Sequence, residues 1–329
     1  MRVRMVPQCS LVFLLVSATA SAQQLGNWSS PMNLGPTVNS PYNDQHATLS
    51  KDGLELVFSS DRPGGLGEFD LWVSTRACGL ASCTWGEPAN LGPIVNSAYR
   101  ELAPNLSTDG HWLLFHSKRP GGCEGDAAPG ADLYASHRRD QSDPLGWEPP
   151  VNLGCTINTP ADDAGPNLFE DDGGTFFLYF TRCNASVAPD YAPCSDAQQD
   201  RFDIFVSTCS GDLGDCIRLQ LWSAAELVPE LSTPLRDTRT AIRRRDGLEM
   251  IVSTNRAGGI GSSDLWSFTR PSTEDPWMDA EDLGVFVNSS AFDGSPALSW
   301  DGQTLIFHSL RPGGSGNADL YMSTRTKGP

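Results

Sequence analysis

The stretch LSKDGLELVFSSDRPGGLGEFDLWV (residues 49–73) decides the fold, because its outline occurs five times along the chain. Each copy carries an Asp-Gly pair, an arginine ten residues after that Asp, a loop, a second Asp and a short apolar run. Before each copy, a tryptophan stands 15 or 16 residues ahead of an acidic residue. Self-similarity of this kind is the signature of a repeat architecture.

Four positions of the repeat are present in all five copies. The tryptophans are Trp28, Trp85, Trp147, Trp222 and Trp277. The acidic residues that follow them, called the ring acids below, are Asp44, Glu101, Asp163, Asp237 and Asp293. The arginines after the Asp-Gly pairs, called the strand-two arginines, are Arg62, Arg119, Arg182, Arg256 and Arg311. The second aspartates, called the loop aspartates, are Asp70, Asp132, Asp203, Asp264 and Asp319.

Each copy predicts four antiparallel strands. In the first copy these are residues 47–50, residues 55–60 after the Asp-Gly hairpin turn, residues 70–75, and the segment that begins at Trp85. Such a unit is typical of a β-propeller blade. The sequence therefore predicts an all-β, five-bladed β-propeller of four-stranded antiparallel blades. Because the first fourth-strand motif precedes the first full copy, we expect the N-terminal strand to complete the last blade and close the ring.

The Asp52-Gly53 pair, the run from Phe58 to Gly65 and the run from Asp70 to Val73 resemble the PD40 repeat, the WD40-like repeat of TolB-type propellers. The resemblance covers the chain after residue 22 and implies a bacterial exported β-propeller. TolB itself has six blades and a separate N-terminal α/β domain, whereas this sequence predicts five blades that start at once. PD40 repeats also occur in peptidases and in a polysaccharide lyase family, so the resemblance implies a fold and not one function.

Residues 1–22 predict a signal peptide. Arg2 and Arg4 precede a short apolar stretch, and Ala20 and Ala22 fit the small-residue cleavage rule. Residues 23–329 then form a single β-propeller domain of five PD40-like repeats. We expect an exported monomer, in the bacterial periplasm or outside the cell, with no membrane span after cleavage of the signal. The formal charge of −17 argues against a nucleic-acid partner, which needs a basic face.

Eight cysteines remain after residue 22, an even number that suits disulfides in an exported chain. Their placement on the blades favours four pairs: Cys78–Cys83, Cys123–Cys155, Cys183–Cys194 and Cys209–Cys216. Other pairings stay open, because sequence alone does not determine connectivity.

The ring acids stand just ahead of the innermost strands, so we expect them to form a ring near the mouth of the central channel. Their carboxylates either cap backbone N–H groups of their loops or bind a ligand, for which Ca²⁺ is the candidate cation. His46 and Arg239 lie two residues after ring acids, where they could meet an anionic group or neutralise the ring. We expect each strand-two arginine to clamp its loop by pairing with the loop aspartate of the same copy.

The main functional expectation is a binding module that engages a protein or an envelope glycan at the axial face, and it implies no enzymatic activity. The alternative is a glycan-active hydrolase or lyase that uses axial carboxylates, with Asp44, Glu101 and Asp163 as the candidates. The sequence contains no nucleophile elbow, zinc-protease motif or phosphate-binding loop.

Overall fold

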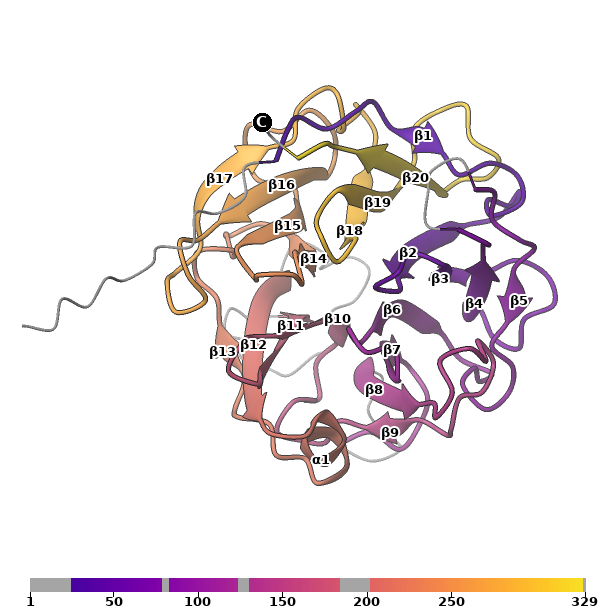
Figure 1. Cartoon of the computed structure of the whole chain (residues 1–329), viewed down its shortest axis with the longest axis vertical. Coiled ribbons are helices and arrows are strands. Elements are labelled where there is room, and N and C mark those ends of the chain that lie inside the picture. Colours follow the sequence, from indigo (N-terminus) through magenta and orange to yellow (C-terminus); the bar gives the residue numbers. More distant parts are fainter. Residues whose placement is uncertain (1–24, 79–82, 124–129, 184–201, 328–329) are drawn as a thin grey trace, which may run out of the picture.

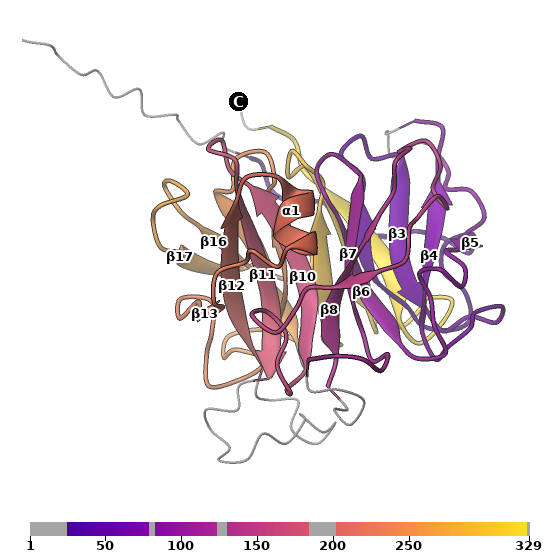
Figure 2. The same cartoon turned by 90° about the horizontal axis from the view of Figure 1, so that it is seen from below.

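The computed structural model describes residues 25–78, 83–123, 130–183 and 202–327. The chain forms five four-stranded antiparallel sheets arranged around one axis (Figure 1). This is the predicted five-bladed β-propeller. Within the described residues one helix occurs, α1 (Leu213–Arg218), in the connection after the third strand of blade three (Figure 2). No helix among these residues is long and apolar enough to cross a membrane.

Four blades run from the axis outward in chain order, and in the fifth blade the N-terminal strand β1 takes the outermost place. The innermost strands are β2 (Asp44–Leu49), β6 (Glu101–Leu106), β10 (Asp163–Glu170), β14 (Asp237–Ile242) and β18 (Asp293–Leu298). The second strands are β3 (Glu55–Ser60), β7 (Trp112–Ser117), β11 (Thr175–Cys183), β15 (Glu249–Thr254) and β19 (Thr304–Ser309). The third strands are β4 (Asp70–Thr75), β8 (Asp132–His137), β12 (Phe202–Ser210), β16 (Asp264–Thr269) and β20 (Asp319–Thr324). The outermost strands are β5 (Ala89–Asn90), β9 (Val151–Asn152), β13 (Glu226–Leu227), β17 (Met278–Asp282) and β1 (Met32–Asn33).

The innermost strands begin at the ring acids, three residues earlier than predicted in blade one. The added residues belong to a β-bulge, which shifts the pairing register between Gln45 and Thr48. A bulge leaves its extra residue unpaired and re-aims its side chain, so the alternation rule does not extend through it. The same register shift occurs in the innermost strand of all five blades.

The hydrophobic core lies between blades. One cluster joins Val57 and Leu71 of blade one to Leu106 and Phe115 of blade two, and four others lie at the remaining blade junctions. Strands covered on both faces are apolar along most of their length, as β3 and β7 are. The blades therefore depend on one another, because no sheet buries its faces alone.

The ring closes as predicted, with β1 pairing with β20. Asn39 holds this junction, since its side-chain oxygen accepts from Leu320 N at 2.8 Å and its amide donates to Leu320 O at 2.9 Å. Asn96, Asn158 and Asn288 make the same pair of bonds at three other junctions. Closure therefore reuses the bond pattern of the ordinary blade-to-blade junctions.

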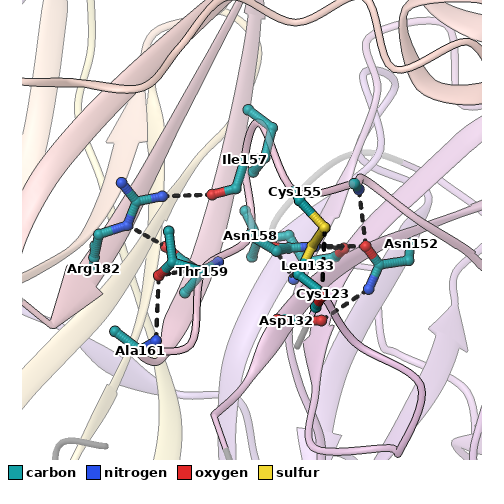
Figure 3. Close-up of a disulfide and its surroundings, with 12 residues drawn as sticks. Cys123, Asp132, Leu133, Asn152, Cys155, Ile157, Asn158, Thr159, Ala161 and Arg182 are labelled. Atoms are coloured by element: carbon teal, nitrogen blue, oxygen red, sulfur yellow. Dashed lines mark hydrogen bonds and ion pairs between the residues drawn. A yellow bond between two sulfur atoms is a disulfide. The ribbon is translucent and has the colours of Figure 1, made fainter. Parts of the chain in front are cut away.

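Three predicted disulfides are present: Cys78–Cys83, Cys123–Cys155 and Cys209–Cys216. The Cys123–Cys155 bond joins the loop between β7 and β8 to the segment that leaves β9 for blade three (Figure 3). Cys183 is also disulfide-bonded, and its predicted partner Cys194 lies outside the described residues. Disulfides fit an exported protein. The predicted signal peptide lies outside the described residues as well.

We predict that Asn39→Ala lowers the free energy of unfolding by about 2–4 kcal/mol, because two buried backbone groups of Leu320 lose their partners. Urea denaturation followed by tryptophan fluorescence measures this change. Asn27→Ala, at an exposed position of the same N-terminal segment, is the control and should leave the midpoint unchanged. Equal midpoints for the two variants would contradict a role of Asn39 in closure.

Candidate functional site

The ring acids are fully buried, and each one holds the loop that precedes its own strand. Asp293 accepts from Ser289 N at 2.6 Å and from Ser289 Oγ at 2.7 Å. Asp44, Asp163 and Asp237 accept in the same way from the residue four positions earlier, and Glu101 does so through its two oxygens. This agrees with the interpretation that the carboxylates cap backbone N–H groups.

The second carboxylate oxygen of Asp293 accepts from Arg311 Nη2 at 2.6 Å. Arg311 also donates to Val287 O at 2.7 Å and, through Nε, to Ser309 Oγ at 2.8 Å. Its guanidinium lies over the ring of Tyr321, 4.9 Å from the centroid. The equivalent ion pairs are Arg62–Asp44 (2.5 Å), Arg119–Glu101 (3.1 Å), Arg182–Asp163 (2.6 Å) and Arg256–Asp237 (3.2 Å).

The predicted pairing of strand-two arginines with loop aspartates (Arg62 with Asp70 and its equivalents) is therefore wrong. Asp319 accepts instead from Ser315 N (2.5 Å), Gly316 N (3.0 Å) and Asn33 Nδ2 (3.0 Å). Asp319 is as buried as Asp293, and three neutral donors satisfy its carboxylate, whereas Asp293 keeps one oxygen for Arg311. Figure 3 shows Asp132 bonded to Asn152, while Arg182 lies apart from Asp132 and bonds to Ile157 O.

The axial cavity is narrow, about 30 Å³, and the ring acids do not line it. Their carboxylates face their own loops and arginines, so of the two predicted roles the structure shows the capping of the loops and no convergence on the axis. Among the residues that the structure describes, no three His, Cys, Asp or Glu side chains gather as a metal site. The ring acids therefore offer no set of free oxygen ligands for Ca²⁺.

The residue two after each ring acid lines the cavity instead: His46, Ala103, Gly165, Arg239 and Ser295. All five have positive φ, from 49° at Arg239 to 61° at Gly165. This conformation costs little for glycine but roughly 1–2 kcal/mol for other residues. His46 and Arg239, both selected from the sequence, thus reach the axis from strained positions at the bulges of blades one and four.

Two further histidines lie near the axis, and the sequence analysis did not assign them to the site. His116 and His308 occupy matching positions in β7 and β19 and are buried. The His46 and His308 rings meet edge to face at 5.4 Å, and His116 Nδ1 lies 3.4 Å from Gly165 N. Burial, and then the nearby Arg239 charge, lower the pKa of His308 to about 3 and hold the pKa values of His46 and His116 well below 6.5. The three imidazoles are therefore neutral at neutral pH.

A second recurring arginine packs on the blade tryptophans. The sequence analysis did not identify it, although its spacing is regular. It stands six residues after the loop aspartate, as Arg76, Arg138, Arg270 and Arg325. Each covers the tryptophan of its blade, at 4.0 to 4.5 Å from the ring centroid, and donates to the glycine carbonyl of the Asp-Gly turn. Blade three has Cys209 at this position, and the Cys209–Cys216 disulfide holds its connection instead.

No protein-family model matches this sequence, and a comparison with curated proteins finds no match. The PD40 resemblance therefore stays a prediction. Solved structures match the fold at low identity. The catalytic domain of a GH62 α-L-arabinofuranosidase from Coprinopsis cinerea is 14% identical, with a TM-score of 0.55 over 91% of this chain and 97% of that one.

Two other structures match in the same way. An α-L-arabinofuranosidase from Podospora anserina, in complex with cellotriose, is 12% identical, with a TM-score of 0.51 over 92% of this chain and 97% of that one. A xylan β-1,4-xylosidase from Bacillus halodurans C-125 is 14% identical, with a TM-score of 0.53 over 87% of this chain and 53% of that one. Likeness at these identities shows a shared fold.

We predict that Arg311→Ala lowers the free energy of unfolding by about 3–5 kcal/mol, because the fully buried Asp293 carboxylate loses its cation. Arg139→Ala is the matched control. Arg139 pairs with Glu148 at 3.1 Å but is 87% exposed, so its loss should cost less than about 1 kcal/mol. Chemical denaturation of the two variants measures both values, and similar costs would contradict a special role of the buried pair.

The lowered pKa of His308 predicts a pH dependence of stability. The unfolded chain binds a proton near pH 6.5 and the folded chain near pH 3, so stability present above pH 6.5 is lost as the pH falls toward 3. The loss reaches about 1.4 kcal/mol per pH unit for one such group. In His308→Gln the fall in free energy of unfolding between pH 7 and pH 4 should be smaller. Carboxylate protonation is common to both proteins, so equal falls would contradict the prediction.

Proposed function

We propose that this protein is an exported five-bladed β-propeller that binds a glycan at the axial face where the loops before the innermost strands lie. The observation that carries the proposal is the state of the ring acids. All five carboxylates are buried and bonded to their own arginines and loops, so they shape this face without acting at it. The cavity between them is too narrow to enclose a sugar ring.

Exposed aromatic residues on this face support a glycan as the partner. Tyr42 and Tyr99 occupy matching positions two residues before the ring acids of adjacent blades, and they are 44% and 46% exposed. A tyrosine ring offers an apolar face and a hydroxyl, which suit the C–H face and the hydroxyl groups of a sugar. Arg100, next to Tyr99, pairs with Glu68 at 3.1 Å and so adds a charged pair at the same rim. The structures that share the fold are glycan-acting proteins by their descriptions, which also favours a glycan over a protein partner.

We expect Tyr42→Ala combined with Tyr99→Ala to weaken retention on a bound polysaccharide by about tenfold, because stacking residues at a binding face carry much of the affinity. Affinity electrophoresis against a panel of neutral and acidic polysaccharides measures the retention. Leu219→Ala removes an exposed apolar side chain beside α1, away from this face, and is the control. Unchanged retention in the double variant would contradict the placement of the site.

A glycan-active hydrolase or lyase in the same face is the second candidate, and the comparisons favour it over a purely protein-binding role. Asp163 is its strongest candidate acid, because burial raises the pKa of its carboxyl to about 6, in the range of a general acid. Asp44 and Glu101 would have to leave Arg62 and Arg119 to act with it.

Release of reducing ends from the polysaccharide panel distinguishes the two candidates. Release that falls in Asp163→Asn and Glu101→Gln would support the enzyme and overturn binding as the sole function. Retention without release supports the binding module. Melting curves of both variants show whether a lost activity reflects lost chemistry or lost folding.

A further inference from the structure

The axial channel collects positive charge in a protein whose net charge is −17. Arg239 enters it from blade four. Arg100, Lys118 and Arg236 add repulsion that lowers the pKa values of the buried imidazoles, but Arg100 pairs with Glu68 at 3.1 Å and Lys118 pairs with Asp162 at 3.5 Å. The ring acids do not balance this charge, since each is already paired with its strand-two arginine. The channel is therefore a local cationic site and not part of a general surface bias.

Arg239 is the centre of this site. Its Nη1 is buried without a hydrogen-bond partner, and Arg239 forms no ion pair within the described part of the chain. The side chain reaches across to blade three, where a Cβ on Gly165 would collide with Nη1. Burial, and then repulsion from Arg236, lower its pKa to about 9, so it stays charged at neutral pH. A buried cation without a partner is costly and calls for an anion.

Other donors beside Arg239 are also free. Thr240 lines the cavity at 5% exposure, and its buried Oγ1 has no hydrogen-bond partner among the described residues. Buried Nδ1 atoms of His46 and His308 are without partners there too. A hydroxyl and neutral imidazoles can each donate one hydrogen bond to an oxyanion. Unsatisfied buried donors around one cation are rare in folded proteins and need an explanation.

One end of the channel is closed by a side chain that crosses the axis. At the far end, Arg244 of blade four donates to Leu106 O (2.5 Å) and Leu49 O (2.8 Å), and so crosses the axis to blades two and one. The cavity above it, about 30 Å³, holds about two or three water molecules, since about 10–15 Å³ is needed for each. Such a space admits a single small group and not a whole sugar. The group would enter from the face that carries Tyr42 and Tyr99.

We propose that the axial channel binds one carboxylate or sulfate group of an acidic saccharide, held by Arg239 with Thr240 and His46 as further donors. This inference rests on the proposed glycan-binding function and specifies its ligand class. The sugar ring stays outside the channel, against the tyrosines, while its acid group enters. A charge-assisted bond to a guanidinium, made where water is largely excluded, then selects acidic over neutral glycans.

Arg239→Gly is the decisive variant. It removes the charge, and Gly165 shows that glycine fits the same left-handed position in blade three, so the fold should be retained. Arg239→Ser is a second variant, and Ser295 shows that serine is tolerated at the same position of blade five. Arg139→Gln removes an exposed arginine and serves as the control for net charge.

The probes are sodium glucuronate, sodium acetate, and glucose with sodium chloride at equal ionic strength, tested by calorimetry and melting temperature on the full chain. We expect glucuronate to bind and raise the melting temperature, acetate to bind more weakly, and glucose with chloride to have no effect. Arg239→Gly and Arg239→Ser should lose at least about tenfold in glucuronate affinity, and Arg139→Gln should lose none.

Equal effects of glucose with chloride and of glucuronate, or full glucuronate affinity in both Arg239 variants, would overturn the inference. Acetate as effective as glucuronate would show a site for free anions and overturn the saccharide assignment. Acidic polysaccharides retained equally by the natural protein and by Arg239→Gly would leave the proposed function standing and overturn the inference alone. Glucuronate binding without retention on any polysaccharide would overturn the proposed function instead.

Discussion

The buried ion pair between a strand-two arginine and a ring acid is the interaction on which the rest of this structure depends. In each blade it joins the end of the second strand to the start of the first, and it holds the preceding loop through the Val287 carbonyl or its equivalent. Such a pair adds little net stability over an apolar contact, but removal of one partner is expensive. Its five copies therefore specify the arrangement of the loops on the axial face. They also use the carboxylates that would otherwise act there.

With the acids turned away, the chemistry of the axis comes from a different position. Every innermost strand carries a bulge with one left-handed residue, and the backbone requirement is the same in all five blades. Glycine satisfies it in blade three at little cost, yet blades one and four place His46 and Arg239 there. The left-handed backbone at this position is strained for residues other than glycine, and the side chains there differ between blades. A strained position of this kind points to function. The repeated strands and bulges form the scaffold, and the residues that differ between blades at the bulge position form the axial site.

The ring acids are paired within their blades and Arg239 is not paired with any described residue in the axial channel, which explains how an acidic protein can offer a cationic site. Acidic side chains dominate the composition, but the ring acids are neutralised within each blade. The Arg239 guanidinium, which has no ion-pair partner in the described part of the chain, then determines the local potential among neutral imidazoles. The small volume of the axial cavity strengthens the potential of Arg239, because the little water it holds cannot screen the charge as bulk solvent would.

By itself, the sequence determined the blade count, the order of strands within a blade and closure by the N-terminal strand, because each follows from spacing along the chain. It favoured three of the disulfides among several open pairings, and the structure contains them. Tertiary structure alone decided the partner of each arginine. Ser60 lies opposite Asp44 on one side and Asp70 on the other, so Arg62 two residues later could turn toward either acid. Arg62 Nη2 meets Asp44 together with the Val38 carbonyl, so the loop before β2 supplies two acceptors on that side. The meeting of His46, His308 and Arg239 was likewise invisible in the spacing, since it joins side chains from three blades across an axis that exists only once the ring has closed.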